Sequence, residues 1–227
     1  MVTGGGRGLG RAIADELTER GVVAVACALR RRTDAASPVY AVDVRRPDEV
    51  AAFVALVERE FGPIGTLVNN AGWVAPYRNL EDADDDEFRR YVDTNIGGVF
   101  HFLRQVIPRM RARSRGRIVN VSSRAATKVH SGLALYSATK LAVRGLTQAV
   151  AKELAESGDF LCVSVSPGGI DTEMRASLFG AELARSEQSA ASVARIVADL
   201  VDGSLSVPTG ADVEIVAGKV TSITAMR

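Results

Sequence analysis

Cysteine is scarce in this chain: Cys27 and Cys162 are the only two among its 227 residues. Two distant cysteines form neither a disulfide framework nor a ladder of metal ligands, so we expect no metal site. The longest unbroken apolar run, residues 22–29, is far shorter than the ~18 residues that a membrane span requires. Glycines follow Met1 almost at once, without the charged and apolar regions of a signal peptide, so none is expected.

An excess of either charge is also missing, since 28 basic residues face 27 acidic ones. We therefore expect neither nucleic acid nor an anionic membrane as a partner. Two local runs of charge, acidic at 81–87 and basic at 109–117, lie at opposite ends of one predicted helix, where the helix dipole favours them. With 47% hydrophobic and 24% charged residues, the chain is expected to be a cytoplasmic protein with a single domain over residues 1–227.

Short β-branched runs alternate with longer amphipathic stretches along the chain. Strands are predicted at residues 22–28, 39–43, 66–69, 117–122, 160–166 and 213–217. Helices are predicted at residues 11–20, 49–61, 85–111, 135–156 and 190–201. All strands but the second are nearly continuously apolar, as strands covered on both faces are. The alternation predicts an α/β fold of three layers, a doubly wound parallel sheet of the Rossmann type.

A glycine-rich turn, TGGGRGLG at residues 3–10, precedes the first predicted helix. Its glycines at positions 4, 8 and 10 follow the spacing G-x-x-x-G-x-G. Glycine permits positive φ angles and lets the backbone approach a ligand closely, and the helix that follows offers its N-terminus to a pyrophosphate. A tight turn without a ligand is the alternative interpretation of the same residues.

The spacing resembles the short-chain dehydrogenase/reductase family, and further motifs follow in that family's order. They are Asp43-Val44, the segment Asn69-Asn70-Ala71-Gly72, Asn95, the pair Ser122-Ser123, the motif Tyr136-x-x-x-Lys140, and the segment from Pro167-Gly168 to Thr172. Together they cover nearly the whole chain. Within the family the pattern looks most like 3-oxoacyl-acyl-carrier-protein reductases. The resemblance implies an oxidoreductase that uses a nicotinamide cofactor.

The resemblance also implies which residues hold that cofactor, with Asp43 receiving the amino group of the adenine. The residues implied are Gly4, Gly6, Arg7, Gly8, Leu9, Gly10, Arg30, Asp43, Val44, Asn70, Ala71, Gly72, Tyr136, Lys140, Pro167, Gly168, Ile170 and Thr172.

Tyr136 and Lys140 are four residues apart, so on a helix they share one face. A phenol with a pKa near ~10 is a poor acid at neutral pH, but a nearby ammonium and the positive nicotinamide ring lower that pKa. Tyr136 then acts as general acid toward a carbonyl oxygen, or as general base toward an alcohol.

The second hydroxyl of the site comes from a pair of serines, of which only one can face the cleft, because neighbours in a strand face opposite sides. We favour Ser123 as the donor to the substrate oxygen, with Ser122 supporting the backbone; the reversed assignment stays open. By resemblance, Asn95 holds a water of a proton relay.

No acidic residue lies between Glu19 and Asp34, where an NAD site places a carboxylate for the ribose hydroxyls. The stretch instead contains three consecutive arginines, Arg30-Arg31-Arg32, and the glycine turn contains Arg7. Guanidinium groups bind a 2′-phosphate, so NADP(H) is favoured over NAD(H). Arginines that merely face water are the alternative.

The resulting hypothesis is reduction of a ketone, such as a 3-oxoacyl thioester or a polyketide-type carbonyl, to a secondary alcohol with Tyr136 as general acid. One alternative is an NAD(P)-dependent dehydrogenase that oxidises an alcohol, sugar or steroid. Another is a nucleotide-binding sensor or scaffold without catalysis. The resemblance implies a homotetramer or homodimer joined through the helices at 85–111 and 135–156, and a small-molecule or carrier-bound substrate.

Other expectations concern the ends and edges of the site. Only Met1 and Val2 precede the glycine turn, so the central strand is predicted to be truncated, with its neighbours' backbone groups unpaired. A short loop is expected between Arg32 and Val39. Trp73 and the apolar residues at 174, 178 and 179 line the substrate pocket or simply pack. His130 is able to reach a substrate, whereas His101 is not expected to.

Overall fold

Eight strands form one sheet in the computed structural model, which describes residues 1–32 and 37–225. Their order is β10-β9-β6-β5-β4-β1-β2-β3, parallel throughout except for β10 against β9. The strands are β1 (Val2–Thr3), β2 (Ala26–Ala28), β3 (Val39–Ala41), β4 (Thr66–Asn69), β5 (Arg115–Val121), β6 (Asp159–Pro167), β9 (Asp212–Val216) and β10 (Lys219–Thr224). A short ribbon of β7 (Ile170–Asp171) and β8 (Gln188–Ser189) lies apart from this sheet.

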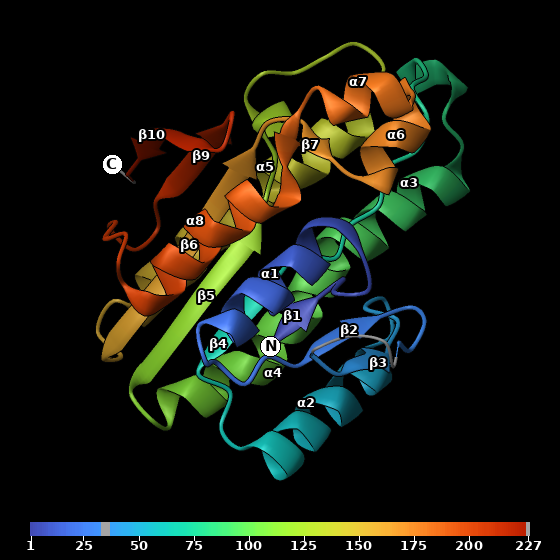
Figure 1. Ribbon diagram of the computed structural model, residues 1–227. Helices are drawn as coiled ribbons and strands as arrows, with labels where there is room; N and C mark the ends of the chain where they lie inside the picture. The colour runs from blue at the N-terminus through green and yellow to red at the C-terminus, as the bar shows by residue number, and fades with distance from the viewer. Residues whose placement is uncertain (33–36, 226–227) are drawn as a thin grey trace.

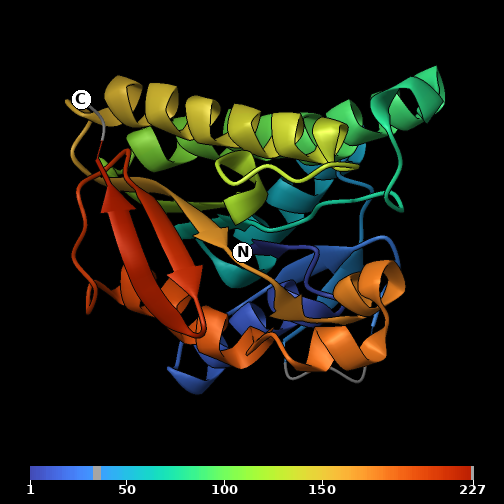
Figure 2. The same ribbon diagram turned by 90° about the horizontal axis from the view of Figure 1, so that it is seen from above.

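Helices cover both faces of the sheet, as the sequence predicts (Figures 1 and 2). One face is covered by α1 (Gly8–Glu19) and α8 (Ala190–Asp202), and the other by α2 (Pro47–Phe61), α4 (Gly98–Arg111) and α5 (Ala134–Leu154). The shorter elements are α3 (Asp85–Tyr91), α6 (Glu173–Phe179), α7 (Ala181–Arg185) and the single turns Leu80–Asp82 and Arg124–Ala126. None of the helices described in residues 1–32 and 37–225 is long and apolar enough to cross a membrane.

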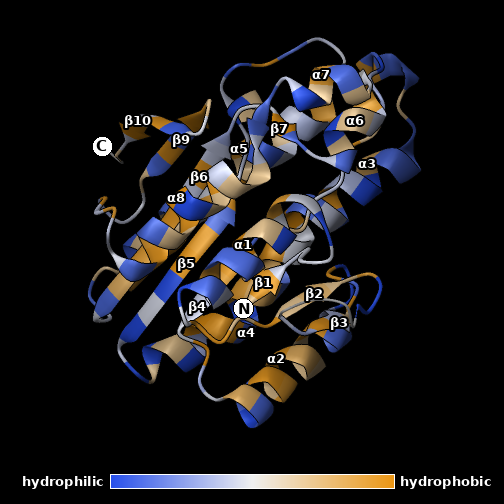
Figure 3. Cartoon of the chain, in the orientation of Figure 1, coloured by the Kyte–Doolittle hydropathy of each residue, from blue (hydrophilic) through white to orange (hydrophobic). Residues whose placement is uncertain are grey.

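The hydrophobic core has two parts, one on each face of the sheet, because neighbouring residues of each strand point to opposite faces. In β4, Leu67 packs with Phe102 and the other residues under α2, α4 and α5, whereas Val68 packs with Ile13 and the residues under α1 and α8. Figure 3 shows the same pattern, with hydrophobic residues along β1 and β2 and both colours along the helices. Burial on both faces explains why the strands are nearly continuously apolar.

The central strand β1 has only two residues, yet its neighbours are paired. Val2 donates its N–H to the carbonyl oxygen of Val25 at 2.9 Å, and Val68 donates to the carbonyl oxygen of Met1 at 2.9 Å. The expectation that the strands beside it lose their partners is therefore wrong for this stretch of the sheet.

Three predicted elements differ notably from the structure. The strand predicted at 22–28 contains only Ala26–Ala28, because Val22 donates to Leu17 and closes the turn after α1. The strand predicted at 39–43 ends at Ala41, so Asp43 lies in the turn beyond it. The helix predicted at 85–111 is divided by a π-helical segment, Val92–Gly97. The short loop expected after Arg32 includes residues 33–36, which lie outside the described residues.

Elements absent from the prediction lie after β6. The short helices α6 and α7 and the ribbon β7–β8 fill the segment between β6 and α8, and β10 adds an antiparallel edge strand. Each has few residues and no clear apolar period, so the pattern in the sequence is weak there.

Candidate active site

The candidate site lies where the carboxyl ends of β1, β4, β5 and β6 meet. The strand order reverses between β1, which precedes β2, and β4, which precedes β5. Loops from the two halves of a doubly wound sheet diverge at such a point and leave a crevice for a ligand. The glycine turn follows β1, the segment 70–73 follows β4, and Ser123 comes two residues after β5.

Tyr136 and Lys140 lie one helical turn apart on α5. The Nζ of Lys140 lies 5.8 Å from the centre of the Tyr136 ring and donates to the carbonyl oxygen of Val121 at 2.8 Å. Only 4% of Lys140 is exposed. Burial lowers the pKa of its ammonium to about 8.

The phenol of Tyr136 is shifted the other way, since burial raises its pKa. A hydrogen bond with Ser123 and the positive charge of Arg175 act in the opposite direction. The sequence attributes the lowering to Lys140; here the protein groups that lower it are Ser123 and Arg175. Without a cofactor, the phenol is therefore held in its protonated form.

The two adjacent serines, which directly follow β5, make different contacts. The hydroxyl of Ser122 is buried and donates to the carbonyl oxygen of Lys140 at 2.8 Å. Ser123 is half-buried, interacts with Tyr136, and accepts from the N–H of Ala125 at 3.1 Å. Ser122 thus supports the backbone of α5, and Ser123 lies beside the phenol.

Asn95 is buried in the π-helical segment, a kind of distortion that often marks a functional position. Its Oδ1 accepts from the N–H of Trp73 at 2.8 Å, and its Nδ2 donates to the carbonyl oxygen of Trp73 and to Thr139 Oγ1, both at 3.0 Å. A Cβ on Gly72 would lie 3.4 Å from Lys140 Nζ and 3.5 Å from Asn95 Oδ1. The side chain of Asn95 thus joins the segment after β4 to α5.

The glycine turn packs against the segment after β4. A Cβ on Gly10 would lie 2.3 Å from Asn70 Nδ2 and 2.4 Å from the carbonyl oxygen of Gly4, so no larger residue fits. Gly4 and Gly8 have positive φ angles of 69° and 54°. Thr3 Oγ1 accepts from the N–H groups of Asn70 and Ala71, each at 2.9 Å.

The start of α1 suits a phosphate group. No side chain caps this N-terminus, and its first turn holds no acidic residue. Leu9 packs its side chain in the core, so only its backbone N–H is available to a ligand. Free N–H groups and the positive end of the helix dipole bind anions, and the residues present therefore fit the pyrophosphate of a dinucleotide.

The arginines expected near the adenosine ribose are placed differently from one another. Arg7 Nη1 lies 2.7 Å from Glu173 Oε2, in an exposed ion pair with α6. Arg30 is exposed, and Arg32 donates from Nη1 to the carbonyl oxygen of Gly6 at 2.9 Å. Of the triplet, Arg32 thus contacts the glycine turn directly, a placement that the sequence does not single out.

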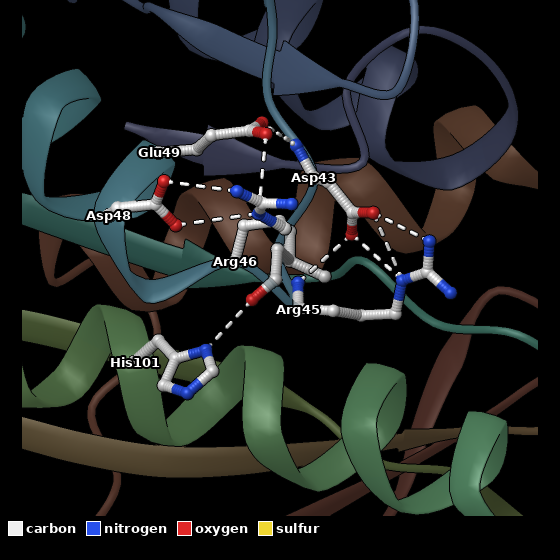
Figure 4. Close-up of polar contacts among 7 residues, drawn as sticks. Asp43, Arg45, Arg46, Asp48, Glu49 and His101 are labelled. Carbon is white, nitrogen blue, oxygen red and sulfur yellow. Dashed lines mark hydrogen bonds and ion pairs between the residues drawn. The ribbon is translucent and has the colours of Figure 1, made fainter.

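Asp43 and Val44 lie in the turn between β3 and α2, two and three residues beyond the strand (Figure 4). Arg45 binds both carboxylate oxygens of Asp43, and this hydrogen bonding lowers the pKa of that carboxyl. Val44 is buried, and a Cβ on Gly98 would lie 2.8 Å from its Cγ2. The adenine segment expected from the sequence is thus packed against the start of α4.

The segment after β6 closes the site on the side of α8. Pro167 ends the strand, Gly168 donates to the carbonyl oxygen of Ile215 at 2.8 Å, and Ile170 pairs with Gln188 in the β7–β8 ribbon. Thr172 caps α6 by accepting from the N–H of Arg175 at 3.2 Å. A Cβ on Gly8 would lie 3.4 Å from the Thr172 methyl group, so this segment reaches the glycine turn.

The remaining candidates have structural contacts. Trp73 lies between the guanidinium of Arg90, 4.2 Å from its ring centre, and the ring of Tyr91 at 4.7 Å. Met174 is 39% exposed, while the side chain at position 179 lies outside the described part of the chain. Cys27 and Cys162 are both buried, and burial raises the pKa of each thiol to about 12. They are core residues.

Comparisons with known proteins bear on this arrangement. Residues 1–183 match the family model described as short chain dehydrogenase. The chain is 38% identical to an acetoacetyl-CoA reductase of Shinella zoogloeoides over 77% of its own length and 74% of that protein's. It is 32% identical to a 3-oxoacyl-[acyl-carrier-protein] reductase of Vibrio cholerae over 87% of its own length and 81% of that protein's.

A solved structure shows the same fold. A 3-ketoacyl-(acyl-carrier-protein) reductase from Brucella melitensis, complexed with NADH, superposes with a TM-score of 0.87 at 27% identity, covering 95% of each chain.

Proposed function

Because the chain belongs to the short-chain dehydrogenase/reductase family and is an oxidoreductase, we propose that it reduces a ketone to a secondary alcohol with NADPH. The observation that carries the proposal is the grouping of Ser123, Tyr136 and Lys140 at the carboxyl ends of the central strands. In that grouping the phenol contacts the serine hydroxyl, and the buried ammonium lies 5.8 Å from the phenol ring.

The chain's own residues account for the proton chemistry. Ser123 donates a hydrogen bond to the substrate carbonyl oxygen and stabilises the negative charge that develops there. Tyr136 then transfers its phenolic proton to that oxygen as general acid. The nicotinamide of the cofactor supplies the hydride when bound. Ser123 and Arg175, which lower the pKa of the phenol, stabilise the phenolate left behind, and Lys140 and Asn95 take part in the relay that returns the proton.

Reduction uses the protonated phenol of Tyr136 as the proton donor. Oxidation of an alcohol would need the phenolate instead. A scaffold without catalysis has no use for an ammonium buried beside a phenol, because such burial costs stability.

The cofactor would be held by the glycine turn, the start of α1 and the segments after β3, β4 and β6. NADPH is proposed over NADH because residues 29–32 carry three arginines and no carboxylate. Arg32 on the glycine turn and Arg7, once released from Glu173, are the guanidinium groups nearest to that turn. Guanidinium groups bind phosphate and a carboxylate repels it.

The substrate proposed is a 3-oxoacyl thioester or a similar ketone, which the names of the relatives support. Assembly into a dimer or tetramer through α4 and α5, and a cytoplasmic location, also remain proposals. Phe100 on α4 is 47% exposed and Leu141 on α5 is 54% exposed, which suits a helical interface. Light scattering of the purified protein measures the assembly.

The variant Tyr136→Phe tests the catalytic proposal. We expect it to bind NADPH like the wild type, while turnover of acetoacetyl-CoA, followed by NADPH absorbance, falls by about 10²–10⁴-fold. Tyr40→Phe is the matched control, since Tyr40 packs on Phe53 away from the site, and it should keep full activity. Retained turnover in Tyr136→Phe would exclude the phenol as the acid, and a preference for NADH would exclude the cofactor assignment.

A further inference from the structure

The turn between β3 and α2 is held by several polar contacts (Figure 4). Arg45 Nε lies 3.0 Å from each carboxylate oxygen of Asp43, and Arg45 Nη2 lies 2.6 Å from Asp43 Oδ2. The backbone N–H of Arg45 also donates to Asp43 Oδ1 at 3.0 Å. A two-pronged contact of this kind fixes the plane of a carboxylate as well as its position. Asp43 is therefore held in one orientation.

The next residue, Val44, is held from the other side by α4. Its carbonyl oxygen lies 2.9 Å from Nδ1 of His101. A carbonyl oxygen only accepts hydrogen bonds, so Nδ1 carries the hydrogen in this contact. The close approach of Val44 to Gly98 brings the same peptide against the helix. His101 therefore fixes the Val44 peptide to a helix that lies 57 residues further along the chain.

The backbone N–H of Val44 differs from those of Asp43 and Arg45 in its hydrogen bonding. Asp43 donates its N–H to Glu49 Oε2 at 2.8 Å, and Arg45 donates its N–H to Asp43. No acceptor for the Val44 N–H is found among the residues that the structure describes. A backbone donor without a protein partner is available to a ligand. The turn thus offers one fixed acceptor, the Asp43 carboxylate, next to one fixed donor.

This pair matches the edge of an adenine, whose amino group donates and whose ring nitrogen N1 accepts. The match depends on both groups being held still, because a carboxylate or peptide that must first be ordered loses affinity. Neither Arg45 nor His101 needs to touch the ligand for this effect. Each acts through the residue that it holds.

We propose that Arg45 and His101 are positioning residues for the adenine of the cofactor, Arg45 by orienting the Asp43 carboxylate and His101 by fixing the Val44 peptide. The inference rests on the proposed function, since it assumes an adenine dinucleotide in this site. It adds two residues whose effect is confined to recognition of the base and does not extend to the reacting carbonyl.

Arg46 provides a matched control within the same turn. Its guanidinium lies 3.2 Å from Asp48 Oδ2 and 3.7 Å from Glu49 Oε1, and it does not bind the side chain of Asp43. Arg45→Gln and Arg46→Gln remove the same charge from the same turn, but only the first releases the carboxylate. His101→Asn keeps a donor near the place of Nδ1, whereas His101→Leu removes it.

The experiment compares NADPH with reduced nicotinamide hypoxanthine dinucleotide phosphate, measured by the fluorescence of the bound cofactor without substrate. Hypoxanthine carries an oxygen in place of the amino group and a hydrogen on N1, so it reverses both contacts. We expect the wild type to bind NADPH more tightly. Arg45→Gln and His101→Leu should weaken NADPH binding about three- to tenfold and leave the hypoxanthine cofactor unchanged. Arg46→Gln and His101→Asn should resemble the wild type.

The same variants should raise KM for NADPH without lowering kcat, because the reacting groups are untouched. Equal losses for both cofactors would mean a structural role and would overturn the inference, as would unchanged binding of NADPH in Arg45→Gln. Failure of the proposed function has a different signature, since the wild type would then bind neither cofactor or would bind NADPH without reducing a ketone.

Discussion

The carboxylate of Glu173 lies 2.7 Å from the guanidinium of Arg7, so the first helix after β6 is joined to the glycine turn across 166 residues of sequence. Both side chains are exposed, at 73% and 68%. An exposed ion pair contributes only ~0.2–1 kcal/mol, which a phosphate group can readily replace. If the cofactor is NADPH, as proposed, Glu173 would compete with its 2′-phosphate for Arg7.

Replacing Glu173 by Gln should release Arg7 for the cofactor. We expect the Kd for NADPH to fall about two- to fivefold, the factor that corresponds to an exposed ion pair, with the Kd for NADH unchanged. Titration calorimetry with both cofactors measures the difference. Glu182→Gln, in the exposed helix α7, is the control and should change neither value. An equal change for NADH would mean that Arg7 does not contact the 2′-phosphate.

The adjacent serines should separate catalysis from stability. Ser123→Ala should lower kcat by about 10²–10³-fold, the usual cost of losing a donor to a developing oxyanion, with little change in stability. Ser122→Ala should lower the free energy of unfolding by about 1 kcal/mol, because the bond to the Lys140 carbonyl is lost, while activity stays within a few-fold. Steady-state kinetics and urea unfolding of both variants make the comparison; the reverse pattern would exchange the two roles.

The buried ammonium of Lys140 should cost stability in a pH-dependent way. Its pKa is lowered to about 8 in the folded protein, against about 10.5 in the unfolded chain, so between these values the unfolded chain binds more protons and unfolding becomes harder as pH rises.

Lys140→Met removes this cost. At pH 7 we expect the variant to be more stable than the wild type by about 1–3 kcal/mol, with the difference shrinking as pH approaches 10, and to have lost its activity. Urea unfolding at the two pH values measures it. A difference that does not change with pH would show that the ammonium is not the cause.

Arg20 joins α1 to α8 through several carboxylates. Its Nη1 lies 2.7 Å from both Asp199 and Asp202, and Glu16 receives its third contact at 2.8 Å. Arg20→Gln should lower the free energy of unfolding by about 1 kcal/mol, and less at high salt. Arg59→Gln, which loses only a contact with the adjacent Glu60, should have no measurable effect.

The same network should respond to acid. The hydrogen bonds from Ser204 and then from Arg20 lower the pKa of Asp202 to about 2. The contribution of Asp202 to the free energy of unfolding is therefore complete above ~3.8, the pKa of this carboxyl in the unfolded chain. It is lost as pH falls from there toward 2. In Arg20→Gln this acid-dependent loss should be smaller, as chemical unfolding between pH 2 and pH 5 would show. Identical pH profiles for the two proteins would contradict the role of Arg20.

Much of the site was predictable because its signals are local. The spacing of Tyr136 and Lys140 alone places them on one helical face, and alternation in an extended chain predicts that only one of Ser122 and Ser123 faces the site. The fold class followed from the apolar period of the strands and helices in the same way. Whether these residues carry the proposed chemistry is for the variants to decide.

The errors have local causes as well. The valines at 22 and 23 extend an apolar run, yet both are exposed, because the chain is still leaving α1 at that point. The helix predicted at 85–111 has a continuous period, which gives no sign of the π-helical segment around Asn95. Periodicity reports which face is apolar and does not report how the backbone hydrogen bonds shift.

By itself the sequence determined the layered α/β fold and the position of the glycine turn, since both depend on spacing between near neighbours, and its resemblance to a family indicated the residues at the ends of the strands. Only the tertiary structure decided that Arg7 pairs with Glu173, that Arg32 contacts the glycine turn, and that His101 reaches the Val44 carbonyl. Such contacts arise when helices dock on a sheet and bring distant side chains within 3 Å, and no local pattern encodes that geometry.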